Sequence, residues 1–261
     1  MQQNIFLPVF ISDLNKKLIK KSMKSLRSLT FAVIILATTS CIHGQFWRTV
    51  EGHGKVVSRE RKTESFTGVK VSSGIDVYLK QGNNETVTVE ADENLHEYIL
   101  TEVRGGVLNV YSEYNIRDAE RKRVYVIMKE VNSLKTTSAG DIYGESPVNT
   151  DRLELSASSA GNIKLEAHAK NIDIDISSSG DITLTGETDK LRADLSSAGD
   201  LNAYDMKSRE ADISVSSAGD ADVYASERIT ARASSAGDVN YKGDPKYVDA
   251  HSSSAGGIHR R

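Results

Sequence analysis

The segment LSSAGD at residues 195–200 returns as VSSAGD at 215–220 and as ASSAGD at 233–238. Close variants of it are TTSAGD at 136–141, ASSAGN at 157–162 and ISSSGD at 176–181. Aligned on the glycine, the series is Gly140, Gly161, Gly180, Gly199, Gly219, Gly237 and Gly256, with spacings of 21, 19, 19, 20, 18 and 19 residues. Self-similarity at a fixed period of this length is the signature of a solenoid.

Apolar and polar residues alternate on both sides of each glycine. The stretch IDIDI at 172–176 precedes Gly180, and ITL at 182–184 follows it. A period of two residues is typical of a β-strand with one buried face, and no helical period competes with it. Each unit of about 19 residues is therefore predicted to contain one strand, a tight corner, a second strand and a short return loop.

Stacked repeats of this kind predict an all-β fold. A strand that is apolar on one face cannot bury that face alone, but each coil can cover the next and close a common core. We predict a single-stranded β-helix, a solenoid with about 19 residues per coil, over residues 133–261. Coils would stack at about 4.8 Å, and we expect the right-handed form, because crossovers between parallel strands are right-handed.

The repeated corner is interpreted first as a structural element. Glycine is expected to supply a backbone conformation that bulkier residues avoid, while serine and aspartate bond to nearby backbone. The alternative is a cation column, in which stacked carboxylates bind calcium: Asp181, Asp200, Asp220 and Asp238, continued by Asp141 and Asn162. The GGxGxD repeat of calcium-binding β-rolls is absent from the sequence, which favours the structural interpretation.

The half of the chain before the repeats is less regular. VKVSSGIDVYL at 69–79 aligns with the repeats as a first coil and places Asp76 in the aspartate column. Alternating stretches at 85–92, 105–113 and 123–130 predict three more strands, and 93–100 a short helix. We expect residues 63–132 to form this first coil and a flanking set of N-terminal β-strands that covers the open end of the solenoid.

The N-terminus has the features of an export signal. Five lysines between positions 16 and 24 precede LTFAVIILA at 29–37, which is shorter than the roughly 20 residues of a membrane-spanning helix. We assign residues 1–44 to a signal peptide region, with Met23 as the expected start, and 45–62 to a linker. Cys41, the only cysteine, is a candidate for lipidation; ordinary cleavage near Gly44 is the alternative.

Charge and motifs exclude several functional classes. The formal net charge is −3, so the chain provides no overall positive field for nucleic acid. HExxH, GxSxG and paired cysteines are absent, the six histidines share no spacing, and we expect neither a catalytic site nor a cofactor. Tyr204 and Tyr224, each five residues after a corner glycine, are the candidate binding residues: they would stack on sugar rings or form an aromatic ladder within the sheet.

The opening FTGVKVSSGIDVYLKQG at 66–82, followed by repeats of Gly-Asp or Gly-Asn and an apolar residue, resembles a bacterial family. It is the auto-transporter adhesin head domain, also called the head GIN domain, which is common in Bacteroidetes. The matching residues are Phe66, Gly68, Val69, Gly74, Asp76 and Val77 at the start, then SAGD from Ser138 to Asp238 in the repeats. The resemblance implies an exported β-helical protein, with adhesion suggested by the family name.

Three functions follow as hypotheses. The first is a non-catalytic binding or adhesion-related module of the cell envelope, with a glycan or an envelope protein as its partner. The second is a β-helical enzyme acting on polysaccharides, and the third a structural envelope protein that self-assembles end to end. We expect the protein in the periplasm, in the outer membrane or at the cell surface. Its only expected attachment to a membrane is a lipid on Cys41. The sequence does not specify whether it forms oligomers.

Overall fold

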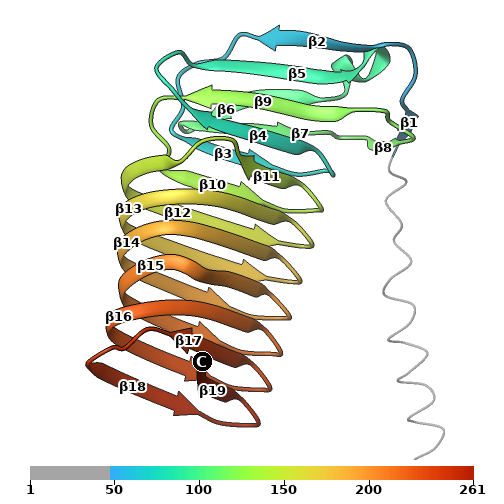
Figure 1. The fold of residues 1–261 in the computed structure, drawn as a ribbon. Helices are drawn as coiled ribbons and strands as arrows, with labels where there is room; N and C mark the ends of the chain where they lie inside the picture. The colour runs from blue at the N-terminus through green and yellow to red at the C-terminus, as the bar shows by residue number, and fades with distance from the viewer. Residues whose placement is uncertain (1–47) are drawn as a thin grey trace, which may run out of the picture. The chain divides into compact units, whose positions relative to one another are not determined.

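The computed structural model describes residues 48–261. These residues form an all-β solenoid, so the predicted fold class is confirmed (Figure 1). Its central coils are built from long strands that follow one another along the axis: β12 (Val148–Ser158), β13 (Asn162–Ser177), β14 (Asp181–Leu195), β15 (Asp200–Val215) and β16 (Asp220–Ala233).

Neighbouring coils pair in parallel and in register. Ile172 on β13 pairs with Leu191 on β14, 19 positions later, and Ile174 pairs with Ala193. The same column runs through the successive coils from β12 onward: Leu153, Ile172, Leu191, Ala211, Ile229 and Val248. Equivalent residues of successive repeats therefore lie directly above one another, as the period predicts; the hand of the solenoid stays a prediction.

The return from one coil to the next is a strand rather than the short loop expected from the sequence. β13 continues without a break from the residue after one corner to the residue before the next. In its middle part Ala167 pairs with Gly186 and Ala169 with Thr188, so the ladder encloses the third side of each coil. Backbone groups that stack on a neighbouring coil gain hydrogen bonds that a loop would leave to water.

The core is a narrow column of aliphatic side chains. Ile172, Ile174 and Ile176 point inward from β13 and are at most 2% exposed. Further along the solenoid the inward residues become smaller, as in Ala231 and Ala233. Their burial along every coil is the main stabilising contribution to this fold.

The first coil of the solenoid lies between two coils that come later in the sequence. β3 (Gly68–Val71) and β4 (Asp76–Gln81) pair in parallel with β10 (Ser133–Thr136) and β11 (Asp141–Gly144). On their other side they pair in parallel with β7 (Val107–Tyr111) and β9 (Lys122–Met128). The chain thus builds a coil outside the first one and then returns past it, an order that alternation of residues does not reveal.

Antiparallel strands close this end of the solenoid, as expected. β5 (Thr86–Asp92) pairs with β9, β2 (Val56–Arg61) with β5, and β6 (Leu100–Arg104) with β7. The 3-10 helix η1 (Glu93–Glu97) buries Leu95 against them. β1 (Thr49–Glu51) pairs with β8 (Asn115–Arg117), so the stretch expected to be a linker contains the two strands β1 and β2.

Among residues 48–261 no such set of strands covers the opposite end of the solenoid. β17 (Asp238–Lys242) stacks on β16, and the last coil consists of β18 (Tyr247–Ser252) and β19 (Gly257–Arg260). Val248 lies in an inward position but is 52% exposed. Within residues 48–261 no helix has the length and hydropathy needed to cross a membrane.

Candidate functional site

The corners differ from the expectation in which residue carries the unusual backbone. The two residues before each glycine have positive φ, for example 55° at Ser197 and 58° at Ala198, whereas the corner glycines themselves do not. The N–H of Gly180 donates to the carbonyl of Ser177, 3.1 Å away, which closes a four-residue turn. Positive φ at both central residues is the mark of a type I′ turn, which normally prefers glycine, asparagine or aspartate there.

Close packing between coils explains the glycine instead. A Cβ on Gly180 would lie 2.5 Å from the carbonyl carbon and oxygen of Ala157 in the preceding coil. The left-handed residues are held by a ladder in which Ala198 N–H donates to the carbonyl of Ser217 at 3.0 Å. The glycine is therefore needed for space, and the prediction that it supplies the left-handed conformation was wrong.

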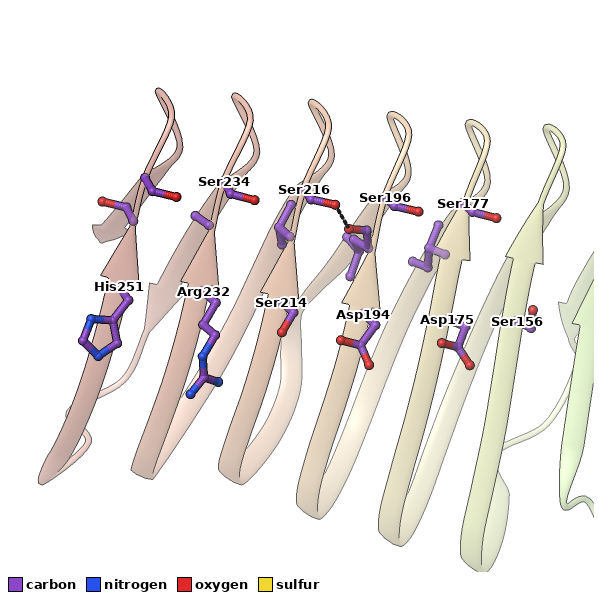
Figure 2. A pocket seen from close by; sticks show the side chains of 16 residues that line it. Ser156, Asp175, Ser177, Asp194, Ser196, Ser214, Ser216, Arg232, Ser234 and His251 are labelled. Atoms are coloured by element: carbon purple, nitrogen blue, oxygen red, sulfur yellow. Dashed lines mark hydrogen bonds between the residues drawn. The ribbon is translucent and has the colours of Figure 1, made fainter.

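A groove of about 700 Å³ follows the solenoid along the strand ends just before the corners (Figure 2). One wall is a column of corner serines, one from each coil: Ser177, Ser196, Ser216, Ser234 and Ser253. The second column consists of the outward residues two positions earlier: Ser156, Asp175, Asp194, Ser214, Arg232 and His251. Sequence reasoning missed this groove, although the serine that opens each corner motif from residue 158 onward was its visible signal.

The serine hydroxyls of the groove are mostly without protein partners. Ser216 donates weakly to the carbonyl of Leu195, at 3.4 Å. Over the described residues, the hydroxyls of Ser177, Ser196 and Ser234 make no hydrogen bond within the protein. A hydroxyl can donate one hydrogen bond and accept others, so this column offers a repeated, open set of polar contacts.

Charge changes sign along the groove. Asp175 and Asp194 lie in register in adjacent coils, and Arg232 and His251 occupy the same position closer to the C-terminus. The His251 Nε2 lies 2.8 Å from the Asp249 Oδ1 outside the groove. The groove therefore joins an acidic half to a basic half, with serines along both.

The predicted aspartate column exists as a ladder. Asp181 pairs with Asp200, Asp200 with Asp220, and Asp220 with Asp238. Partial burial, followed by the neighbouring carboxylates, raises the pKa of Asp200 and that of Asp220 above the usual range. No cluster of three or more potential metal ligands is formed within residues 48–261, and cation binding by the column stays a prediction.

Tyr204 and Tyr224 are not stacked on each other among the described ring contacts. The register between β14 and β15 shifts beside Tyr204, which separates it from the regular column. Lys242 Nζ lies 4.0 Å from the ring centroid of Tyr204, and Lys207 Nζ 4.2 Å from that of Tyr224. Tyr224 lines a second groove of about 750 Å³ with Lys207 and Arg209. The structure thus does not contain the predicted aromatic ladder at this pair, and sugar binding by either residue stays a prediction.

An aromatic ladder does occur near the other end of the solenoid. Tyr78 lies between Tyr125 and Tyr143, with centroid distances of 5.3 and 5.4 Å. Burial, followed by the hydrogen bond that its hydroxyl donates to Asp141, raises the pKa of Tyr143 to about 12. Since the rings cover one another's faces, the ladder stabilises the sheet and leaves little ring surface for a ligand.

Two predicted features cannot be placed in the fold. The lipidation candidate Cys41 and the expected start at Met23 lie outside the described residues. The signal peptide region likewise stays a prediction.

Comparison with known proteins identifies related sequences and folds. The model of a family described as "Putative auto-transporter adhesin, head GIN domain" matches residues 65–245. A solved "putative adhesin" from Bacteroides fragilis is 18% identical, with a TM-score of 0.75, and covers 81% of this chain and 100% of its own. A "putative lipid binding protein" from Parabacteroides distasonis is 25% identical, with a TM-score of 0.67 and 82% and 100% coverage.

A further solved structure, a "putative adhesin" from Parabacteroides merdae, has a similar fold. It is 19% identical, with a TM-score of 0.66, and covers 82% of this chain and 99% of its own. No curated protein matches the sequence. The two structures below 25% identity show likeness of fold, and the region matched by the family model contains the corners from Gly140 to Gly237.

Proposed function

This chain belongs to the head GIN domain family, and from that premise we propose that it is an exported cell-envelope protein that binds an extended glycan without catalysis. The family is of the adhesin type, which agrees with a role at the envelope. The ligand would lie along the solenoid, in the groove lined by the corner serines.

The repeating serine column is the observation that carries this proposal. The column presents one hydroxyl per coil at a spacing of about 4.8 Å, and several of these hydroxyls have no protein partner in the described chain. A polysaccharide presents hydroxyl groups along its whole length, and hydroxyls pair with hydroxyls as donor or acceptor. A ligand with repeating polar groups could therefore contact several coils at once.

The similar structure with a lipid-binding name raises an acyl chain as another ligand. Here the groove contains Asp175, Asp194 and Arg232 besides the serines. An acyl chain laid over these groups would remove water from them without replacing their hydrogen bonds, which is unfavourable. The lining therefore supports a hydroxyl-rich ligand.

The test is a triple variant, Ser177→Ala, Ser196→Ala and Ser216→Ala, compared with the unchanged protein on an array of bacterial glycans. We expect retention on the bound glycan to fall by about tenfold or more, since each lost hydrogen bond contributes about 0.5–1.5 kcal/mol. Thr183→Ala with Asn202→Ala, on the strands after the corner, is the matched control and should bind normally. If the triple variant bound as well as the unchanged protein, the glycan would not bind in this groove.

The two tyrosines can be tested on the same array. If sugar rings stack on Tyr204 or Tyr224, the double alanine variant loses retention while the serine variant keeps it. We expect the reverse, because each ring is already covered on one face by a lysine.

A polysaccharide-cleaving enzyme is the second candidate, because Asp175 and Asp194 lie side by side in register on the groove. Glycosidases use two carboxyl groups flanking the scissile bond. Both carboxylates here are exposed on an open surface, whereas a general acid usually needs burial to keep its proton at neutral pH. We therefore expect no release of reducing ends from a bound glycan; release that is lost in Asp175→Asn would favour the enzyme.

A further inference from the structure

We propose that the C-terminal coil is a dimerisation surface, on which β18 pairs antiparallel with β18 of a second copy of this chain. The inference does not rest on glycan binding, although His251 also lines the groove. It starts from an end of the solenoid where strand pairing stops although the core continues to the edge.

The last coil leaves core residues exposed. Val248 is the inward counterpart of Ile229, yet Val248 is 52% exposed and Ile229 is fully buried. Tyr247, beside it, is 63% exposed, and in the described chain these two are the large hydrophobic residues that lie open to solvent. β18 pairs with β16 on one side only, so its other edge presents free N–H and C=O groups to any strand that can align with it.

The closed N-terminal end of the solenoid explains why two copies would join through their C-terminal coils. The N-terminal end is closed by antiparallel strands and by η1, which buries Leu95 and is followed by the buried Ile99. Its outermost strand, β2, carries the charged residues Arg59, Glu60 and Arg61. Within residues 48–261 the exposed core residues lie at the C-terminal end, which favours a closed two-fold pair over a filament.

The alternation of inward and outward side chains along β18 selects one register for the pairing of the two β18 strands. Residues opposite each other in an antiparallel pair share a face, so a two-fold axis at Ala250 places inward residues against inward residues. In that register Asp249 of each copy lies opposite His251 of the other. Within one copy, His251 Nε2 lies 2.8 Å from Asp249 Oδ1. The two aspartates and two histidines of the pair would then form an alternating ring, in which each carboxylate has an imidazole on both sides.

Two further charged residues at this end are engaged within one copy. Arg260 is bound to Asp244 of the same copy at 2.8 Å, and Arg228 lies over the Tyr247 ring, 5.0 Å from its centroid. The edge of one coil is a small surface, and small interfaces give weak, reversible complexes. We therefore expect association at protein concentrations of roughly 1–100 µM.

The first test changes the charges at positions 249 and 251 and measures association by light scattering. Light scattering on the purified protein over this concentration range should show a monomer–dimer equilibrium without larger species. His251→Asp places four carboxylates together and should weaken the dimer by about tenfold or more. The double change Asp249→His with His251→Asp restores alternation and should restore the dimer. Ser214→Asp, which adds a charge at the same position two coils away, is the control and should leave association unchanged.

The second test locates the axis. In a background with Cys41→Ser, Ala250→Cys should form a disulfide-linked dimer under mild oxidation, because residues opposite each other across antiparallel strands lie within disulfide reach. Tyr247→Cys lies about 20 Å from its counterpart in this register and should not cross-link. A protein that stays monomeric throughout the range, forms filaments, or cross-links equally at both positions overturns the proposal.

Discussion

At the scale of single residues, the corner shows how close packing can override conformational preference. Ser197 and Ala198 adopt a left-handed backbone that costs a residue with a side chain about 1–2 kcal/mol. Gly199, which could adopt it freely, has no positive φ; glycine is needed there because the preceding coil leaves no room for a Cβ. The motif could be recognised from sequence as a corner, but the assignment of φ could not, since it depends on the distance to a neighbouring coil.

Gly180→Ala tests the spatial requirement. The new Cβ would lie 2.5 Å from the backbone of Ala157, so either the two coils separate or the corner distorts. We expect the free energy of unfolding, from urea titration, to fall by about 3 kcal/mol or more. Gly105→Ala, with φ of 60° and no atom within 4 Å of the new Cβ, is the control and should lose only about 1 kcal/mol. Equal losses would contradict the packing argument.

Ala198→Gly tests the conformational strain at the same corner. Relief of the left-handed backbone at φ 58° should outweigh the greater freedom of glycine in the unfolded chain. We expect a gain of about 0.5 kcal/mol in urea titration. Ala193→Gly, in the buried strand β14, should instead destabilise the protein. A loss at both positions would mean that the corner is not strained.

At the scale of strands and sheets, the alternation of apolar and polar residues and the period of about 19 residues predict most of the strands of the repeat region and their register. The stretch IDIDI at 172–176 forms part of β13 with its isoleucines buried, and the aspartate column pairs in the predicted register. Prediction fails where a contact is made outside the repeat. The bulge beside Tyr204 and the pairing of β3 with β7 depend on which strands meet in space, and the local pattern of residues does not specify that.

The aspartate ladder should make stability depend on pH. The pKa of Asp200 is raised in the fold, first by burial and then by Asp181, so the folded state binds this proton more tightly than the unfolded chain. The ionised group therefore lowers stability at neutral pH, and the loss is relieved as the pH falls through the folded-state pKa. Asp200→Asn should gain about 0.5 kcal/mol at pH 7.

The gain of Asp200→Asn should shrink with acidification and vanish below the ordinary aspartate pKa of about 3.9. Thermal unfolding at several pH values measures it. Asp212→Asn is the control, because Asp212 faces Arg232 at 3.9 Å and its replacement should give no gain at any pH. A gain for Asp200→Asn that is independent of pH would show that charge repulsion is not its cause.

At the scale of the whole molecule, the solenoid is a one-dimensional stack in which each coil contacts its neighbours. The period of the corners predicts the stack, and the aliphatic columns predict its core. The groove on its surface was not predicted, because it arises from the curl of successive corners beside the strands and not from any single repeat.

Removal of one complete coil tests this modularity. Deletion of residues 191–210 joins Lys190 to Ala211 and keeps the register, because Leu191 and Ala211 occupy equivalent positions. We expect a folded protein with a lower, still cooperative melting temperature in circular dichroism. Deletion of residues 191–199 alone removes the end of β14 and the corner after it, and should abolish cooperative unfolding. Similar behaviour of both deletions would contradict a stack of equivalent coils.

β3 and β4 lie between two coils that come later in the sequence, and this order affects how the chain folds. Both neighbours of this segment, β7 with β9 and β10 with β11, are synthesised after it. A ribosome therefore releases residues 68–81 before either docking site exists, and the second support is complete only at Gly144, 63 residues after Gln81. Nascent chains truncated before residue 144 would therefore lack one of the two sets of strands that support the first coil.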